Sequence, residues 1–139
     1  MHFTTLFVLK GASLEDLSFS EIEEMFCDRF CYSCGESRPM YRYWCDWFQI
    51  GGRWCDLLVA KTGWTGERSW CNGDDETLPN HFSVVEIKDL TEPIDKDNIY
   101  AVATRSRIYE DAYEQYDKLI DQINAKKFDG VIALIDCHD

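Results

Sequence analysis

Runs of apolar and β-branched residues alternate along the chain with two segments whose apolar residues recur every three or four positions. Residues 2–10 form the first apolar run, which favours a strand that ends at a glycine. Ser20 and Glu23 have the spacing of a capping box, and a helix that begins there is expected to continue to about Phe30. Residues 106–127 carry apolar side chains at helical spacing and are predicted to form the second helix.

The remaining runs predict strands. Residues 43–50 and 53–60 are joined by a Gly-Gly pair, a pattern typical of a β-hairpin, with a β-bulge as the alternative. The polar stretch over residues 61–79 is expected to be a loop. Three further short strands are predicted over residues 82–87, 98–104 and 131–136. This order of elements predicts one α+β domain over residues 1–139, a mostly antiparallel sheet of about five strands with two helices packed on one face.

The composition adds a strong negative charge, because 26 acidic residues oppose 14 basic ones and the formal net charge is −12. Nucleic-acid binding depends on cations that replace counterions on the phosphates, so direct binding to DNA or RNA is not expected. A basic protein partner is favoured, and an acidic surface that serves only solubility is the alternative. Neither a signal peptide nor a membrane-span-sized apolar run is present, so we expect a cytoplasmic protein without membrane contact.

Seven cysteines in a protein expected in a reducing compartment favour thiols or metal ligands over disulfides. Cys31 and Cys34 form a C-x-x-C-G knuckle, and Cys27 precedes Cys31 by one helical turn. With Cys45 as the fourth ligand, these residues predict a structural zinc ion that staples the fold. Other candidates for the fourth ligand are Cys55, Cys71 and a histidine. Buried free thiols and a redox pair are the alternatives to zinc.

The most distinctive segment covers residues 46–54, where a Gly-Gly-Arg-Trp turn follows an acidic and aromatic run. The Asp46 carboxylate is expected to accept a bidentate pair of hydrogen bonds from Arg53, with Trp47 and Trp54 covering the pair. A latch of this kind would only hold the hairpin. The alternative is a ligand pocket around Asp46, Arg53 and Trp54, to which Arg68 would add.

This segment resembles one in small proteins of phages and mobile elements, which carry an Asp-Trp-(Tyr/Phe)-x-(Ile/Val)-Gly-Gly-Arg-Trp sequence. The resemblance continues in a Gly-Glu-Arg-Ser-Trp piece at residues 66–70 and in the Asp-Cys-His sequence at residues 136–138. Some small acidic phage proteins of this sort look like anti-CRISPR inhibitors and a few carry zinc, which is what the resemblance implies for this chain. The sequence departs from the family pattern at Cys45, where an aromatic residue is usual, and at Cys55, and both changes fit a metal site particular to this branch.

Four carboxylates recur along the second predicted helix at the spacing of one face. They are Glu110, Glu114, Asp117 and Asp121. Such a row is similar in spacing to the phosphates of a nucleic-acid strand, so it favours a surface that imitates nucleic acid and binds a basic partner. A plain solvated helix face is the alternative.

No metalloprotease, nucleophile-elbow or P-loop motif appears in the sequence, so an enzyme is not expected. The leading hypothesis is a non-catalytic, phage-type inhibitor that blocks a host nucleic-acid-handling protein. A CRISPR RNA-guided DNA nuclease is the expected target, because such nucleases hold guide and target in positively charged channels. The alternatives are a small enzyme or nucleotide-binding protein that uses the aromatic pocket, and a zinc-stapled adaptor for another host protein.

Overall fold

The structure, a computed structural model, describes residues 1–31, 44–54, 57–66 and 78–139. The strands are β1 (His2–Lys10), β2 (Trp47–Ile50), β3 (Leu58–Val59), β4 (His81–Phe82), β5 (Val84–Glu86), β6 (Ala101–Ala103), β7 (Ile108–Glu110) and β8 (Gly130–His138). The α-helices of this part are α1 (Phe19–Phe30) and α2 (Glu114–Asn124). Two of the short 3-10 turns bear on the site, namely η2 (Gly52–Trp54) and η4 (Lys96–Asn98).

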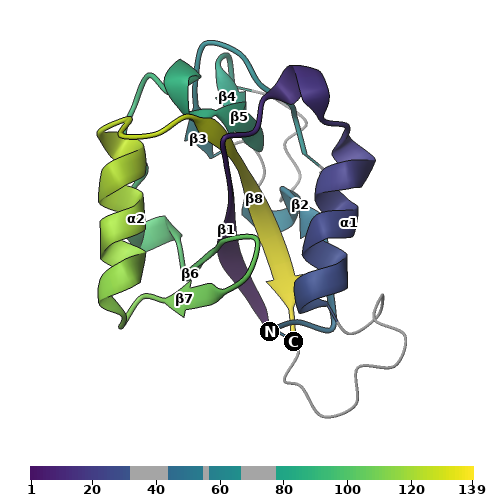
Figure 1. The fold of residues 1–139 in the computed structure, drawn as a ribbon. Helices are drawn as coiled ribbons and strands as arrows, with labels where there is room; N and C mark the ends of the chain where they lie inside the picture. The colour runs from purple at the N-terminus through teal and green to yellow at the C-terminus, as the bar shows by residue number, and fades with distance from the viewer. Residues whose placement is uncertain (32–43, 55–56, 67–77) are drawn as a thin grey trace.

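β1 and β8 pair antiparallel along their whole length at the centre of a six-stranded sheet (Figure 1). On the edge of β1 away from β8, β6 pairs with β1 in the parallel direction. β7 then pairs antiparallel with β6. β2 and β5 both pair with the other side of β8, at opposite ends of that strand. β3 and β4 form a separate two-stranded sheet. The prediction of an α+β fold with a mostly antiparallel sheet is therefore confirmed, with six strands in the main sheet.

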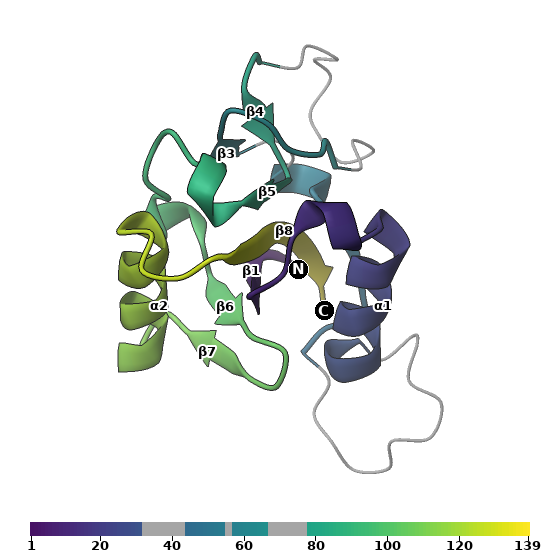
Figure 2. The ribbon, with the colours of Figure 1, turned by 45° about the horizontal axis from the view of Figure 1, so that its top comes forward.

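The two helices cover opposite faces of the sheet, so the prediction that both pack on one face is wrong (Figures 1 and 2). Successive side chains of a strand point to opposite faces, so β1 contributes to two cores. Phe7 lies in the cluster with Phe26 of α1, whereas Leu6 lies in the cluster with Ile120 of α2. Almost every residue of β1 and β8 is buried. A continuous apolar run is the pattern of a strand covered on both faces, and this is the signal that the prediction missed.

The first helix is confirmed, with its capping box two residues earlier than predicted. The Ser18 hydroxyl accepts a hydrogen bond from the Glu21 backbone N–H at 3.2 Å, and the Glu21 carboxylate accepts one from the Ser18 N–H at 3.1 Å. Both groups would otherwise be unpaired donors of the first helical turn, which is why this reciprocal pair sets the helix start.

The second helix is shorter than predicted, because residues 108–110 form β7 instead. A tight turn joins β6 to β7, in which the Thr104 N–H donates to the Arg107 carbonyl at 2.8 Å and Ala103 pairs with Ile108. Pairing with the sheet therefore outweighs the helical spacing of this short segment.

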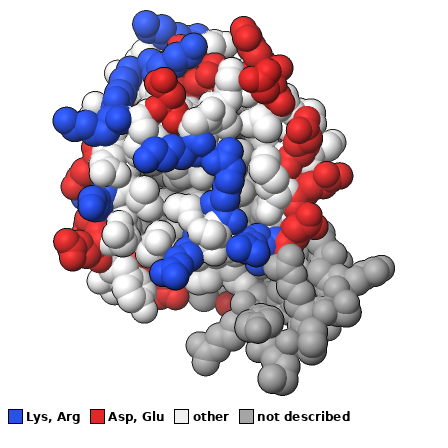
Figure 3. Space-filling model, viewed as in Figure 1, with Lys and Arg blue, Asp and Glu red and all other residues white. Residues whose placement is uncertain are grey.

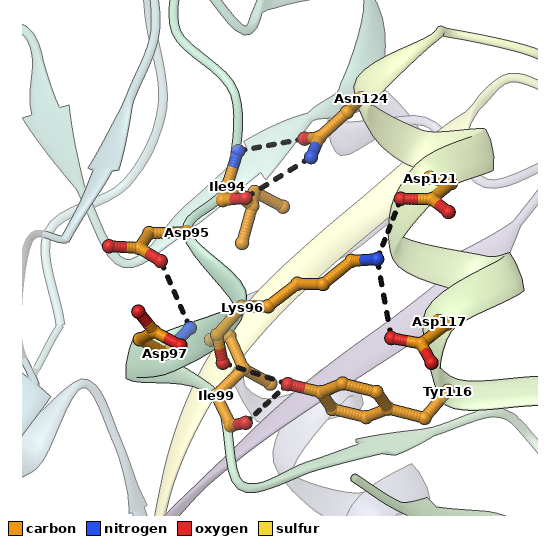
Figure 4. Close-up of polar contacts among 9 residues, drawn as sticks. All are labelled: Ile94, Asp95, Lys96, Asp97, Ile99, Tyr116, Asp117, Asp121 and Asn124. Atoms are coloured by element: carbon orange, nitrogen blue, oxygen red, sulfur yellow. Dashed lines mark hydrogen bonds and ion pairs between the residues drawn. The ribbon is translucent and has the colours of Figure 1, made fainter. Parts of the chain in front are cut away.

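Polar side chains fix α2 to the chain segment that precedes β6 (Figure 4). The Asn124 side chain accepts from the Ile94 N–H at 2.7 Å and donates to the Ile94 carbonyl at 3.1 Å. One turn and two turns before it, Asp121 and Asp117 lie 2.8 Å and 3.2 Å from the ammonium group of Lys96. The contact with Asp121, followed by that with Asp117, raises the pKa of Lys96.

Tyr116 reaches the same segment from the buried side of α2. Its hydroxyl lies 2.8 Å from the carbonyl oxygen of Lys96 and 2.6 Å from that of Ile99, and its one hydrogen is donated to this pair. Burial of the phenol, with smaller contributions from the carboxylates of Asp111 and Asp117, raises the pKa of Tyr116 from 10.0 to about 12. The folded protein therefore keeps this proton at a pH where the unfolded chain has lost it.

We expect Tyr116→Phe to lower the free energy of unfolding by about 1–2 kcal/mol, because two carbonyl groups lose their donor. Because the folded-state pKa is raised, the stability that this group contributes is present below pH 10 and is lost as the pH rises from 10.0 to about 12. The variant should therefore lose less stability than the wild type over that range. Urea unfolding as a function of pH measures this, with the exposed Tyr113→Phe as control, and an unchanged slope in Tyr116→Phe would contradict it.

Candidate functional site

The Gly51-Gly52 pair does not join two paired strands, so the hairpin prediction is wrong. β2 pairs with β8 and β3 pairs with β4, and the chain turns between them through η2. Both glycines have positive φ angles, of 89° and 54°. A Cβ atom built on Gly52 would collide with the side chain of Asp136 on β8. The two glycines therefore allow the turn to bend sharply and to lie directly against β8.

Asp136 is fully buried beneath this turn. Its Oδ2 accepts a hydrogen bond from the backbone N–H of Arg53 at 2.9 Å, and its Oδ1 lies 2.8 Å from Nδ1 of His2. The His2 side chain is itself only 10 % exposed. A buried carboxylate is costly unless hydrogen bonds or an opposite charge compensate it, and these two contacts do so.

The expected ion pair between Asp46 and Arg53 does not form in the described part of the chain, where both residues are exposed. The Asp46 backbone N–H donates to the His138 carbonyl at 2.7 Å, at the end of the pairing of β2 with β8. Arg53 contributes its backbone N–H, which donates to Asp136. Of the three predicted pocket residues, Trp54 lines the cavity of about 580 Å³ described below, whereas Asp46 and Arg53 are not among the described residues that line it.

Aromatic rings surround the contact between His2 and Asp136. Trp47 and His138 stack with ring centroids 5.0 Å apart and an interplanar angle of 17°. The His2 ring meets both of them edge-on, with centroids 5.6 Å from Trp47 and 5.0 Å from His138. Nδ1 of His138 is buried without a hydrogen-bond partner among the described residues. These rings hold the imidazole of His2 in one orientation beside the carboxylate.

A cavity of about 580 Å³ opens next to this contact. It is lined by His2, Trp54, residues 96–100 and the start of α2, and we call it the His2 cavity. Neither His2 nor Asp136 is among the site residues predicted from the sequence. Asp136 had a signal, because it directly follows the apolar run 131–135 of a buried strand, where an acid needs a partner. His2 had no comparable signal, since only the fold brings it to residue 136.

A larger hollow of about 1,190 Å³ lies between α1 and β7, with aromatic side chains such as Trp44 and Tyr100. Its charged residues include Arg29, Arg107 and Glu110, which are of both signs. Figure 3 shows Lys and Arg side chains across the middle of the face between the two helices, and acids along the edge over α1. The charges that line this hollow favour neither an anionic nor a cationic ligand.

Three cysteines converge on the α1 side of the sheet, one of which is not a predicted ligand. Cys45 hydrogen-bonds with Cys137 and with Cys31, and all three are buried free thiols. The contact with Cys137 raises the pKa of the Cys45 thiol far above its ordinary value. The contact with Cys31 opposes this shift and burial adds to it. Cys45 therefore stays protonated and is a poor nucleophile.

The structure leaves the zinc site a prediction. Cys27 takes part in a disulfide bond, whereas the sequence led us to expect a thiolate there. No group of three or more His, Cys, Asp or Glu residues within the described ranges is arranged to hold a metal ion. Outside the described residues lie Cys34, Cys55, Cys71 and Arg68.

The four predicted partner-binding carboxylates are exposed but do not share one helix. We call Glu110, Glu114, Asp117 and Asp121 the acidic patch. Glu110 lies on β7, so the expected straight row along a helix is wrong for this member. The other three project from α2 on the side away from its buried residues Tyr116, Ile120 and Ile123. Lys96 partly neutralises two of them, Asp117 and Asp121.

Comparisons with protein-family models, with curated proteins and with solved structures found no match to this chain. Within the described residues, no helix has the length and apolar character needed to cross a membrane. What the protein binds must therefore be inferred from its own charges, cavities and buried polar contacts.

We expect Gly52→Ala to lower the free energy of unfolding by about 3 kcal/mol, because the added methyl group collides with Asp136 and the backbone is left-handed. Gly11→Ala is the matched control. Gly11 also has a positive φ, of 80°, but nothing lies within 4 Å of an added Cβ atom. The control should cost only about 1–2 kcal/mol. Urea unfolding of both variants measures the difference, and equal losses would show that Asp136 does not constrain the turn.

If a structural zinc ion is present, protein purified without added metal should contain about one zinc per chain. The variants Cys31→Ser and Cys34→Ser should lose both the zinc and the folded state. Metal analysis and circular dichroism measure the two quantities. Protein that is folded and free of zinc would refute the site, and the disulfide of Cys27 would then be the covalent staple.

Proposed function

We propose that the protein acts without catalysis, by binding a basic surface of a protein partner through the acidic patch. The observation that carries this proposal is the placement of Glu110 and Glu114, which are exposed and have no ion-pair partner in the described part of the chain. Surface charges that the fold does not use are available to a partner, and they act chiefly on the rate and specificity of association.

The geometry supports a patch of charge rather than a regular copy of a nucleic-acid backbone. Glu110 lies on β7, before the helix begins at Glu114, so the even helical spacing does not extend over all four residues. Lys96 offsets one of the two charges at Asp117 and Asp121. A net charge of −12 over the whole chain still favours long-range attraction to a basic surface.

The partner that we propose is a host nucleic-acid-handling protein, with a CRISPR RNA-guided DNA nuclease as the first to test. Such nucleases keep guide RNA and target DNA in positively charged channels, which suit an acidic protein. The resemblance of residues 46–54 to phage and mobile-element proteins supports this choice. On this proposal the protein acts in the host cytoplasm and prevents loading of guide or target DNA.

The second candidate is a small enzyme or nucleotide-binding protein. The observation that favours a small-ligand site is the His2 cavity, into which Trp54 faces and where a buried carboxylate orients His2. Asp46 and Arg53 do not line this cavity, so the pocket differs from the one expected from the sequence.

We expect Glu110→Gln combined with Glu114→Gln to weaken binding to the nuclease about tenfold, which is about 1.4 kcal/mol. Competition with DNA loading, measured at two salt concentrations, reports the loss. The matched control is Glu24→Gln with Asp28→Asn, which removes two exposed charges from α1 on the opposite face.

A wild-type protein that leaves DNA loading unchanged in every nuclease of a panel would overturn the proposed partner. Equal losses in the patch variant and the α1 control would show that total charge, and not the acidic patch, is recognised.

A further inference from the structure

The His2 cavity lies where three parts of the chain meet beside the end of β1. The segment before β6, the start of α2 and η2 line it together with His2 and Thr4. Its volume of about 580 Å³ is within the usual range of ligand-binding pockets. A cavity shaped by several separate elements is positioned by the whole fold rather than by one loop.

The floor of the cavity is polar and rigid. His2 is held by Asp136, whose carboxylate is fully buried and also receives the Arg53 backbone N–H. Ring contacts with Trp47 and His138 fix the imidazole further. A ligand that enters therefore meets a pre-oriented imidazole with a negative charge behind it, at little cost in side-chain entropy.

The rim of the cavity carries an excess of negative charge. Asp97, Asp111 and Asp117 line it, and the cation that lines it is Lys96. The Lys96 ammonium group is already within 3.2 Å of Asp117 and 2.8 Å of Asp121. By contrast, Asp97 and Asp111 are exposed and their carboxylates have no ion-pair partner in the part of the chain that the structure describes. Two carboxylates at the mouth are thus available to a cationic ligand.

The walls are aromatic. Trp54, Tyr100 and Tyr116 line the same cavity. Aromatic faces attract cations, and among biological cations the planar guanidinium group both stacks on rings and forms paired hydrogen bonds with carboxylates. A compact ammonium group also donates hydrogen bonds and is attracted to rings, but it lacks the flat face for stacking and the fixed fork of donors that matches a carboxylate. The combination of ring walls with carboxylates at the mouth therefore favours guanidinium over ammonium.

We propose that the His2 cavity binds a guanidinium group, presented by an arginine side chain of the protein partner. This inference rests on the proposed function for the source of the arginine, because the acidic patch continues from the cavity through Asp117. The arginine anchors the complex in the cavity, and the acidic patch attracts the basic surface around it. Buried arginine anchors of this kind carry a large share of the binding energy in protein interfaces.

The direct test uses N-acetyl-arginine amide as a probe of the isolated protein, followed by nuclear magnetic resonance. The probe should shift the Trp54 indole signal and the amide signals of residues 96–98 in a saturable manner. N-acetyl-citrulline amide, which has the same shape without the charge, should not. N-acetyl-lysine amide should bind about threefold or more weakly than the arginine probe.

The variant Asp97→Asn with Asp111→Asn should raise the dissociation constant of the arginine probe about tenfold, and the α1 control Glu24→Gln with Asp28→Asn should leave it unchanged. Both substituted positions are exposed, so the variant is expected to fold. No shift at Trp54, equal binding of citrulline, or equal binding of lysine would each overturn the guanidinium site.

Measuring how the variants bind the nuclease distinguishes a failure of the arginine anchor from a failure of the proposed function. If the cavity variant binds the nuclease as the wild type does while the patch variant does not, the arginine anchor is refuted and the proposed function stands. If the arginine probe saturates at Trp54 but no nuclease in the panel binds, the guanidinium site stands and the proposed partner is refuted.

Discussion

The antiparallel pairing of β1 with β8 supports the main sheet and both hydrophobic cores. Nine residues of each strand pair in register, from His2 with His138 to Lys10 with Gly130. Alternate residues of this ribbon build two separate cores, one under α1 and one under α2. The remaining strands of the main sheet add to the two sides of the ribbon. The same pairing places Asp136 opposite Thr4 and diagonal to His2, so the contact between His2 and Asp136 is a direct product of the strand register.

The buried carboxylate of Asp136 connects two sequence pieces that look independent. The Gly-Gly-Arg segment supplies a backbone N–H to it, and Gly52 leaves the space that its side chain fills. The residue pattern in this segment is therefore explained by packing against β8 rather than by a hairpin.

Local signals in the sequence were enough for some elements and not for others. β1 was predicted with its observed bounds because its apolar run ends at a glycine. α1 was predicted from its apolar face, although its capping box begins at Ser18 and not at the predicted Ser20. The helix predicted over residues 106–127 was too long at its start. Residues 108–110 form a strand because they pair with β6, and this pairing outweighs their helical spacing. The two-sided burial of β1 was readable from its unbroken apolar run, yet both helices were predicted to pack on one face of the sheet.

The candidate site was less accessible to sequence reasoning for a physical reason. His2, Trp54 and Asp136 are far apart along the chain, and no spacing rule relates them before the sheet is known. The carboxylates of the acidic patch were predicted from the sequence. The ion pairs of Asp117 and Asp121 with Lys96 were not, because they depend on the contact between α2 and the segment before β6. The thiol of Cys137 likewise joins Cys45 only through the pairing of β2 with β8.

The central position of β8 has a consequence for biosynthesis. β1 is synthesised well before β8, the strand that pairs with its whole length and begins only at Gly130. At a synthesis rate of about 5–20 residues per second, the apolar β1 waits on the order of ten seconds for that partner. During this time the main sheet cannot be completed, because β1 lacks the strand that pairs with its whole length. The pairing that both cores require therefore forms only once residues 130–138 have been synthesised.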